Sequence, residues 1–263
     1  MPELVRPDGC RLHYELHGPG GATPLILLEG MGDSIAGWRR SLPRLGERHH
    51  VIAYDFRGNG RSTMPEAPVT IATFVEDTVA LFVFLGAGRA HVYGMSFGGM
   101  VAQELALTHP EAVRSLVLAA TRAGGGPPVP RDAGSMNVPK SRPWLALYSE
   151  GFAAAHPAHV ADDLRHGARQ QPNARRRQWE AMRSWRSWDR LPALRVPTLV
   201  LHGTQDRLVP SALGRQLADR IPEAELVLLE GAGHLYHSEQ PEAADRAVLD
   251  FLDGVDARER AAE

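Results

Sequence analysis

Cysteine is nearly absent from this sequence, and neither sign of charge is in clear excess. The single cysteine, Cys10, excludes a disulfide framework within the chain and leaves a cysteine-based zinc or redox site without ligands. Lys and Arg number 29 against 31 Asp and Glu, which gives a formal net charge of -2. Because no global basic field exists, we expect neither nucleic acid nor a membrane surface as a partner.

Long hydrophobic runs are absent as well. No apolar stretch approaches the length that spans a bilayer, and the segment Met1 to Pro7 has no apolar signal-peptide region. These absences predict a cytoplasmic protein. The 12 histidines show no H-E-x-x-H or comparable spacing, so we expect no metal ion.

What the chain does have is a regular alternation of short apolar runs and helical patterns. Strands rich in Val, Ile and Leu are predicted at 25–29, 51–55, 90–95, 113–121, 198–202 and 225–229, with 11–17 as an antiparallel edge. Helices are predicted around 75–85, where Gly86 and Gly88 would end the helix, and at 97–108, 211–220 and 241–252. This alternation predicts a mostly parallel, doubly wound α/β sheet.

Residues 122–190 interrupt the alternation. The segment opens with Gly124-Gly125-Gly126-Pro127-Pro128, which predicts a loop, and then becomes rich in Arg and Trp. We therefore predict a core over 1–121 and 191–255, a helical cap insertion over 122–190 and a flexible tail over 256–263. Trp179, Met182, Trp185 and Trp188 recur at three-residue steps, which spreads them over about half of a helix. Such a row either docks the cap on the core or lines a pocket, with Trp144, Trp179 and Trp185 as candidate pocket residues.

One serine lies between glycines at the end of a predicted strand. In Gly94-Met95-Ser96-Phe97-Gly98 the glycines allow a sharp reversal from strand to helix, which would expose Ser96 at its apex. Alternatively, Ser96 merely caps the following helix.

A nucleophilic serine needs a histidine as base and an acid that orients the histidine. The carboxyl ends of parallel strands share one sheet edge, and there Asp206 follows the strand 198–202 while His234 follows 225–229. The order Ser96, Asp206, His234 is the one that nucleophile-elbow hydrolases use. His237 is a rival base, but its position just before a helix predicts a rim or surface residue.

With these motifs together, the chain resembles the α/β-hydrolase superfamily from about Leu12 to Leu252, and within it small bacterial enol-lactonases and carboxylesterases. The resemblance implies that Ser96 is the nucleophile, His234 the general base and then acid, and Asp206 the orienting acid. It implies an oxyanion hole made by the backbone N–H groups of Phe97 and Met31, and no cofactor.

The chain departs from the family at the loop after the strand 25–29. Where the family usually has His-Gly, this sequence reads Glu29-Gly30-Met31. A carboxylate at Glu29 would weaken oxyanion stabilisation unless it were paired or turned away, and Glu29 is also a candidate pocket residue.

We predict a serine hydrolase that cleaves an ester, lactone or thioester through an acyl-enzyme. The expected partner is a small-molecule substrate of apolar or aromatic character, with an anionic group suggested by the Arg-rich cap, as for a natural-product tailoring hydrolase. Two alternatives stay open: a lyase or C–C bond-cleaving member, and a receptor-like member with little turnover. The sequence leaves the oligomeric state open.

Overall fold

The computed structural model describes residues 2–129, 138, 143–167 and 170–262. Parts of the predicted cap, at 130–137, 139–142 and 168–169, lie outside the described residues. No described helix is both long and apolar enough to cross a membrane.

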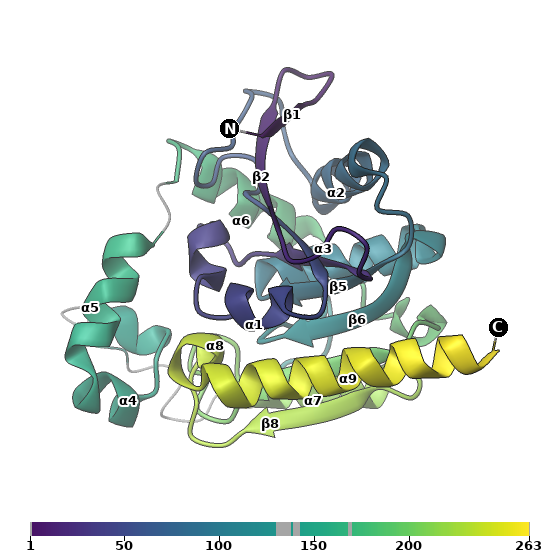
Figure 1. The fold of residues 1–263 in the computed structure, drawn as a ribbon. Helices are drawn as coiled ribbons and strands as arrows, with labels where there is room; N and C mark the ends of the chain where they lie inside the picture. The colour runs from purple at the N-terminus through teal and green to yellow at the C-terminus, as the bar shows by residue number, and fades with distance from the viewer. Residues whose placement is uncertain (1, 130–137, 139–142, 168–169, 263) are drawn as a thin grey trace.

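An 8-stranded sheet forms the centre of the molecule, in the order β1-β2-β4-β3-β5-β6-β7-β8 (Figure 1). Strands β1 and β2 run antiparallel to their neighbours, and every pair from β4 onward is parallel. The predicted mostly parallel sheet is confirmed, while the short edge strand β1 was not predicted. The strands are β1 (Glu3–Val5), β2 (Arg11–His17), β3 (Pro24–Leu28), β4 (His50–Tyr54), β5 (Ala90–Met95), β6 (Val113–Ala119), β7 (Thr198–Gly203) and β8 (Glu225–Leu229).

Helices cover both faces of this sheet. Side chains of a strand alternate between the faces, so that Ile26 packs into one hydrophobic core and Leu27 into the other. The first core is covered by α2 (Ile71–Leu85), α3 (Phe97–Thr108) and α7 (Ser211–Arg220). The second is covered by η1 (Ile35–Trp38), α1 (Leu42–Gly46) and α9 (Pro241–Ala262), and α9 is the long yellow helix in Figure 1. This is the doubly wound arrangement that the sequence predicts.

Local signals set the ends of α2. The Thr70 hydroxyl accepts a hydrogen bond from the backbone N–H of Thr73, whose own hydroxyl accepts from the N–H of Thr70. At the other end Gly86 adopts the left-handed conformation, with a φ of 63° that a residue with a Cβ adopts only at a cost. The prediction that Gly86 ends this helix is confirmed.

The described part of the predicted cap is helical. It contains η3 (Pro143–Ala146), α4 (Glu150–Ala155), α5 (Pro157–His166) and α6 (Ala174–Ser184), and the chain returns through η4 (Leu191–Ala193). Trp185 is 7% exposed and packs into the first core, where its Nε1–H donates to Glu104 Oε2 at 2.7 Å. Trp179 is 51% exposed. The tryptophans therefore differ in their surroundings: Trp185 docks the segment on α3, whereas Trp179 is exposed.

A partly buried carboxylate ties α5 to the core. Asp163 accepts hydrogen bonds from the Tyr148 hydroxyl at 2.9 Å, from Arg40 at 3.0 Å, and also from Arg39 and Ser238. Burial on its own raises the pKa of Asp163, but these donors lower it well below its ordinary value. The carboxylate is thus charged at neutral pH and links the predicted cap to the core.

The C-terminal segment differs from the expected flexible tail over 256–263. Helix α9 continues through Ala262 because Asp256 is 6% exposed and held from several sides. Its carboxylate accepts from the Thr23 hydroxyl at 2.9 Å and lies 2.7 Å from Arg114 Nε. The sequence does not reveal these contacts, because the partners of Asp256 lie far from it along the chain.

Candidate active site

Ser96 occupies the turn between β5 and α3. Its backbone has a φ of 52° and a ψ of -111°, a sparsely populated conformation that costs about 1–3 kcal/mol and persists only where the surroundings impose it. The surroundings here are the end of β6: the Ser96 N–H donates to the Ala119 carbonyl at 2.8 Å, and the Ser96 carbonyl accepts from the Thr121 hydroxyl at 2.6 Å. The side chain makes no capping hydrogen bond to α3, so the capping interpretation of Ser96 has no support.

The flanking glycines are required by close backbone contacts. A Cβ added to Gly94 would lie 2.5 Å from the Gly98 carbonyl oxygen, and one added to Gly98 would overlap the Leu28 carbonyl. The strand can therefore reverse into α3 and pass against β3 only without side chains at these two positions.

His234 and Asp206 form a buried hydrogen-bonded pair. Asp206 follows β7 and His234 follows β8, and His234 Nδ1 lies 2.7 Å from Asp206 Oδ2, with the two residues 3% and 5% exposed. The other carboxylate oxygen, Oδ1, accepts from the backbone N–H groups of Leu208 and Val209 at 2.9 and 2.8 Å. Burial alone would raise the pKa of Asp206, but the neighbouring His234 and His202 bring it down to about 2. The ionised carboxylate accepts the Nδ1–H of His234, which leaves the Nε2 lone pair free to take a proton.

His202 is a member of this cluster that the sequence reasoning missed. Its Nε2 lies 2.7 Å from the Val209 carbonyl and 3.3 Å from Asp206 Oδ2, so the Nε2–H donates to the loop that carries Asp206. A signal was present in the sequence, since His202 lies next to the end of β7 and precedes Asp206 by four positions.

The two segments predicted to supply the oxyanion hole adjoin Ser96. An ideal Cβ on Gly30 would lie 3.7 Å from the Ser96 Cβ, so the loop that continues into Met31 passes beside the serine. Phe97 is the first residue of α3, so its N–H has no acceptor within the helix. Its ring is buried against Phe56 and Phe74, which fixes the start of the helix.

Glu29 is buried in this loop and is 1% exposed. Within the described part of the chain, its Oε1 has no hydrogen-bond partner. Burial first, and then the negative charges of Asp33 and Asp55, raise the pKa of Glu29 well above its ordinary value. Burial and these charges favour the protonated, neutral form of Glu29, which reduces the negative charge that its side chain would place on this loop.

His237 and Asp55, which could be mistaken for the base and the orienting acid, make structural contacts. His237, expected at a rim or on the surface, is 3% exposed and packs its ring 5.4 Å from that of Trp38, so that expectation is wrong. Burial and the nearby His234 lower the pKa of His237 to about 4. Asp55 accepts from the backbone N–H groups of Ile35 and Arg61, both at 2.8 Å, and so holds two loops together.

Two cavities lie beside the predicted pocket residues. A cavity of about 520 Å³ borders the loop after Asp206, with Trp179, Arg122, Arg207 and Leu208 in its lining. A second cavity, of about 350 Å³, lies between η3, α4 and α5 and includes Trp144. Trp185 lines neither of them.

Glu239 in α8 (Tyr236–Glu239) joins the loop of His234 to the start of α4. Its Oε1 accepts from the backbone N–H of Gly233 at 3.0 Å and from that of Ser149 at 2.8 Å. Its Oε2 accepts from the Ser149 hydroxyl at 2.6 Å. One carboxylate therefore fixes the residue before His234 and the residue that caps α4.

Known proteins are similar to this chain over nearly its full length. The model of the alpha/beta hydrolase family matches residues 16–247. A Variovorax paradoxus protein that carries the provisional name carbamate hydrolase RutD is 34% identical over 260 residues, which cover 94% of this chain and 97% of that protein. A hydrolase from Pseudomonas aeruginosa PA01 has a TM-score of 0.84 and 32% identity, over 95% of this chain and 97% of that one. The enol-lactonase of Burkholderia xenovorans LB400 has a TM-score of 0.84 and 27% identity, over 96% and 100% of the two chains.

Proposed function

Since this chain belongs to the alpha/beta hydrolase family, we propose that it is a serine hydrolase in which Ser96 is the nucleophile, His234 the base and Asp206 the orienting acid. The observation that carries the proposal is the buried 2.7 Å pair of His234 and Asp206, at the same sheet edge as the strained turn of Ser96. A buried carboxylate such as that of Asp206 costs free energy, and the strained backbone of Ser96 persists only where the fold imposes it. The presence of both at one edge of the sheet supports a catalytic role for this edge.

In the proposed cycle, His234 passes one proton from Ser96 to the leaving group and a second proton from water back to the Ser96 oxygen. His234 Nε2 takes the hydroxyl proton of Ser96 as the oxygen attacks a carbonyl carbon, and the N–H groups of Phe97 and Met31 stabilise the oxyanion that forms. When the tetrahedral intermediate collapses, the leaving-group oxygen departs with the proton from His234. A water molecule then gives a proton to His234 and attacks the acyl-enzyme, which releases the acid and restores Ser96.

We propose a carboxylic ester or lactone as the substrate class, supported by the likeness to the Burkholderia enol-lactonase. A carbamate is a second candidate, because the Variovorax relative at 34% identity carries that name. Both classes share a carbonyl carbon with a leaving group, so the same three side chains serve either.

An anionic group on the substrate fits the cavity of about 520 Å³. Arg122 lines it, while the neighbouring Arg207 is already paired with Glu150 at 3.0 Å. A carboxylated ester should therefore be cleaved with a higher kcat/KM than the neutral ester of the same acyl group. Equal kcat/KM values for the two esters would show that Arg122 does not bind the substrate.

Labelling with a fluorophosphonate tests the nucleophile, with intact-mass spectrometry of the wild type, Ser96→Ala and the exposed control Ser184→Ala. The proposal requires one adduct on the wild type and on the control, and none on Ser96→Ala. Turnover of a carbonyl substrate without any acyl-enzyme would favour a lyase or C–C bond-cleaving reaction instead. A panel of aryl esters, lactones and carbamates then separates the substrate classes by kcat/KM.

A further inference from the structure

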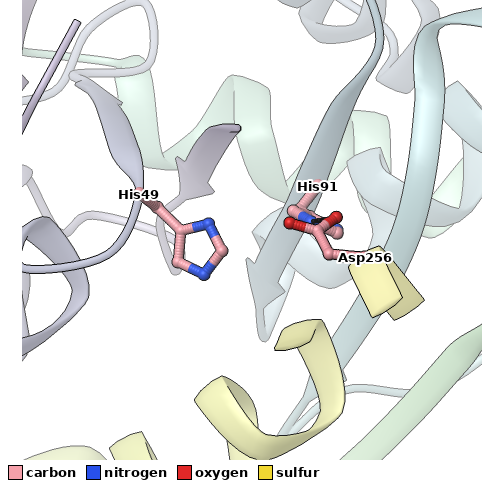
Figure 2. Close-up of side chains that lie close together, drawn as sticks. All are labelled: His49, His91 and Asp256. Atoms are coloured by element: carbon pink, nitrogen blue, oxygen red, sulfur yellow. Dashed lines mark hydrogen bonds and ion pairs between the residues drawn. The ribbon is translucent and has the colours of Figure 1, made fainter. Parts of the chain in front are cut away.

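Three side chains that could bind a metal ion lie close together, apart from Ser96, Asp206 and His234 (Figure 2). His49 directly precedes β4, His91 lies in β5 and Asp256 lies in α9, and they are 2%, 0% and 6% exposed. One ligand atom from each falls within 4.8 Å of the other two. We propose that His49, His91 and Asp256 form a structural site for a divalent cation of the zinc type.

The geometry and the donor types fit such an ion. His91 Nε2 lies 3.1 Å from Asp256 Oδ1. Two ligand atoms in a tetrahedral shell with bonds near 2.0–2.1 Å are about 3.3 Å apart, so this pair already has nearly the required separation. Two imidazoles and one carboxylate are a donor set that Zn²⁺ accepts, with a fourth position left for water.

The side chain of His49 points most directly to a bound ion. Its ring faces His91 and Asp256 in Figure 2, and neither of its ring nitrogens has a hydrogen-bond partner among the described residues. A buried polar group without a partner is costly, and an ion bound to one of the two nitrogens would satisfy it.

The surrounding residues orient the other two ligands. His91 Nδ1 lies 2.7 Å from the Ser115 hydroxyl, and Asp256 Oδ2 accepts from the Thr23 hydroxyl at 2.9 Å. Metal-binding side chains in proteins are held in this way by a second set of hydrogen bonds.

One positive charge competes with the ion. Arg114 Nε lies 2.7 Å from Asp256 Oδ1, while the Nη2 of the same guanidinium lies 2.7 Å from Glu259. An incoming cation would displace Arg114 from Asp256, and Glu259 would keep it paired. Removing this arginine should therefore strengthen the binding of the ion, a result that a purely structural hydrogen-bond cluster does not predict.

The site would connect parts of the chain that are remote in sequence. His91 and Asp256 are 165 residues apart, which explains why no local spacing predicted a metal ion. His91 is also near the start of β5, whereas Ser96 follows the end of that strand. The ion would thus attach α9 to the edge of the sheet where β5 begins, opposite the edge that carries Ser96. Its effect should be on stability rather than on turnover.

The test uses the full chain freed of metal by a chelator and then titrated with Zn²⁺ alone. Bound zinc is counted by elemental mass spectrometry, and thermal unfolding is followed with and without zinc. We expect one zinc per wild-type chain and a higher Tm with zinc. Co²⁺ in place of Zn²⁺ should give the visible absorption bands of a tetrahedral site.

Variants make the test specific. His49→Ala should weaken zinc binding at least about 100-fold, and Ser115→Ala roughly 10- to 100-fold. Arg114→Leu should bind zinc more tightly than the wild type, and His166→Ala, which alters a side chain 53% exposed on α5, should bind as the wild type does. The proposal would be overturned if the wild-type protein bound no zinc, or bound it no more tightly than His49→Ala. Neither result would test the proposed hydrolase activity.

Discussion

Replacing Glu29 by glutamine preserves the size of the side chain and removes a group that titrates. In the unfolded chain Glu29 loses its proton near its ordinary pKa of 4.5, but in the folded protein burial and the charges of Asp33 and Asp55 keep the proton bound to a much higher pH. Between these two pKa values, folding takes up one proton at this position. Glutamine takes up none.

The sign and the size of the effect follow from this uptake. While the folded state binds one more proton than the unfolded state, the free energy of unfolding falls by about 1.4 kcal/mol for each unit of rising pH. The contribution of Glu29 to stability is complete below its unfolded pKa and is lost as the pH rises toward the folded one. Glu29→Gln should therefore gain on the wild type as the pH rises, by about 1.4 kcal/mol per pH unit while the folded carboxyl keeps its proton, and the difference is followed between about pH 6.5 and about pH 8.5. Burial raises the pKa of Asp33 to about 6, so this window avoids most of its titration.

Urea unfolding at several pH values across this window measures the difference. The matched control is Glu47→Gln, an exposed glutamate in the turn after α1, for which the difference from the wild type should stay constant with pH. A constant difference for Glu29→Gln as well would refute the reasoning, because it would mean that Glu29 is ionised in the folded protein. A fall in the free energy of unfolding of Glu29→Gln relative to the wild type as the pH rises would refute it more strongly.

Three further predictions concern the supports of the site. Asp206→Asn should retain the fold but lower kcat on the order of 10⁴-fold, because His234 loses the acceptor that sets its tautomer; steady-state kinetics with circular dichroism as a folding control measure this. Thr121→Val removes the 2.6 Å hydrogen bond to the Ser96 carbonyl and should destabilise the fold by about 1 kcal/mol in urea unfolding, whereas an unchanged value would contradict the support. Asp163→Asn should cost about 2 kcal/mol at neutral pH. Because partners lower the folded pKa of Asp163, that cost should shrink once the pH falls below its ordinary value of 3.8, as denaturation at two pH values can show.

Features set by neighbours in the sequence could be predicted. The turn around Ser96 depends on glycines within two residues of it, and the end of α2 depends on Gly86. Asp206 and His234 were found because parallel strands bring their carboxyl ends to one edge, so that locating the strands also locates the loops.

Features set by distant contacts could not be predicted. The raised pKa of Glu29 depends on its burial and on the charges of Asp33 and Asp55, and Asp256 in α9 is held by Thr23 and by Arg114 in β6. His237 was predicted as a rim or surface residue because of its position just before a helix, whereas in the fold it is buried and packs against Trp38 and Tyr236. In each case the cause is a contact between segments whose separation along the chain carries no local pattern.

The carboxylate of Glu239 has a mechanical consequence. It accepts hydrogen bonds from Gly233, next to His234, and from Ser149, the N-cap of α4, so it couples these two segments. A displacement of α4 would therefore be transmitted to the loop that carries His234, the proposed base. Under the proposed function, the position of α4 would then control the alignment of the proton acceptor.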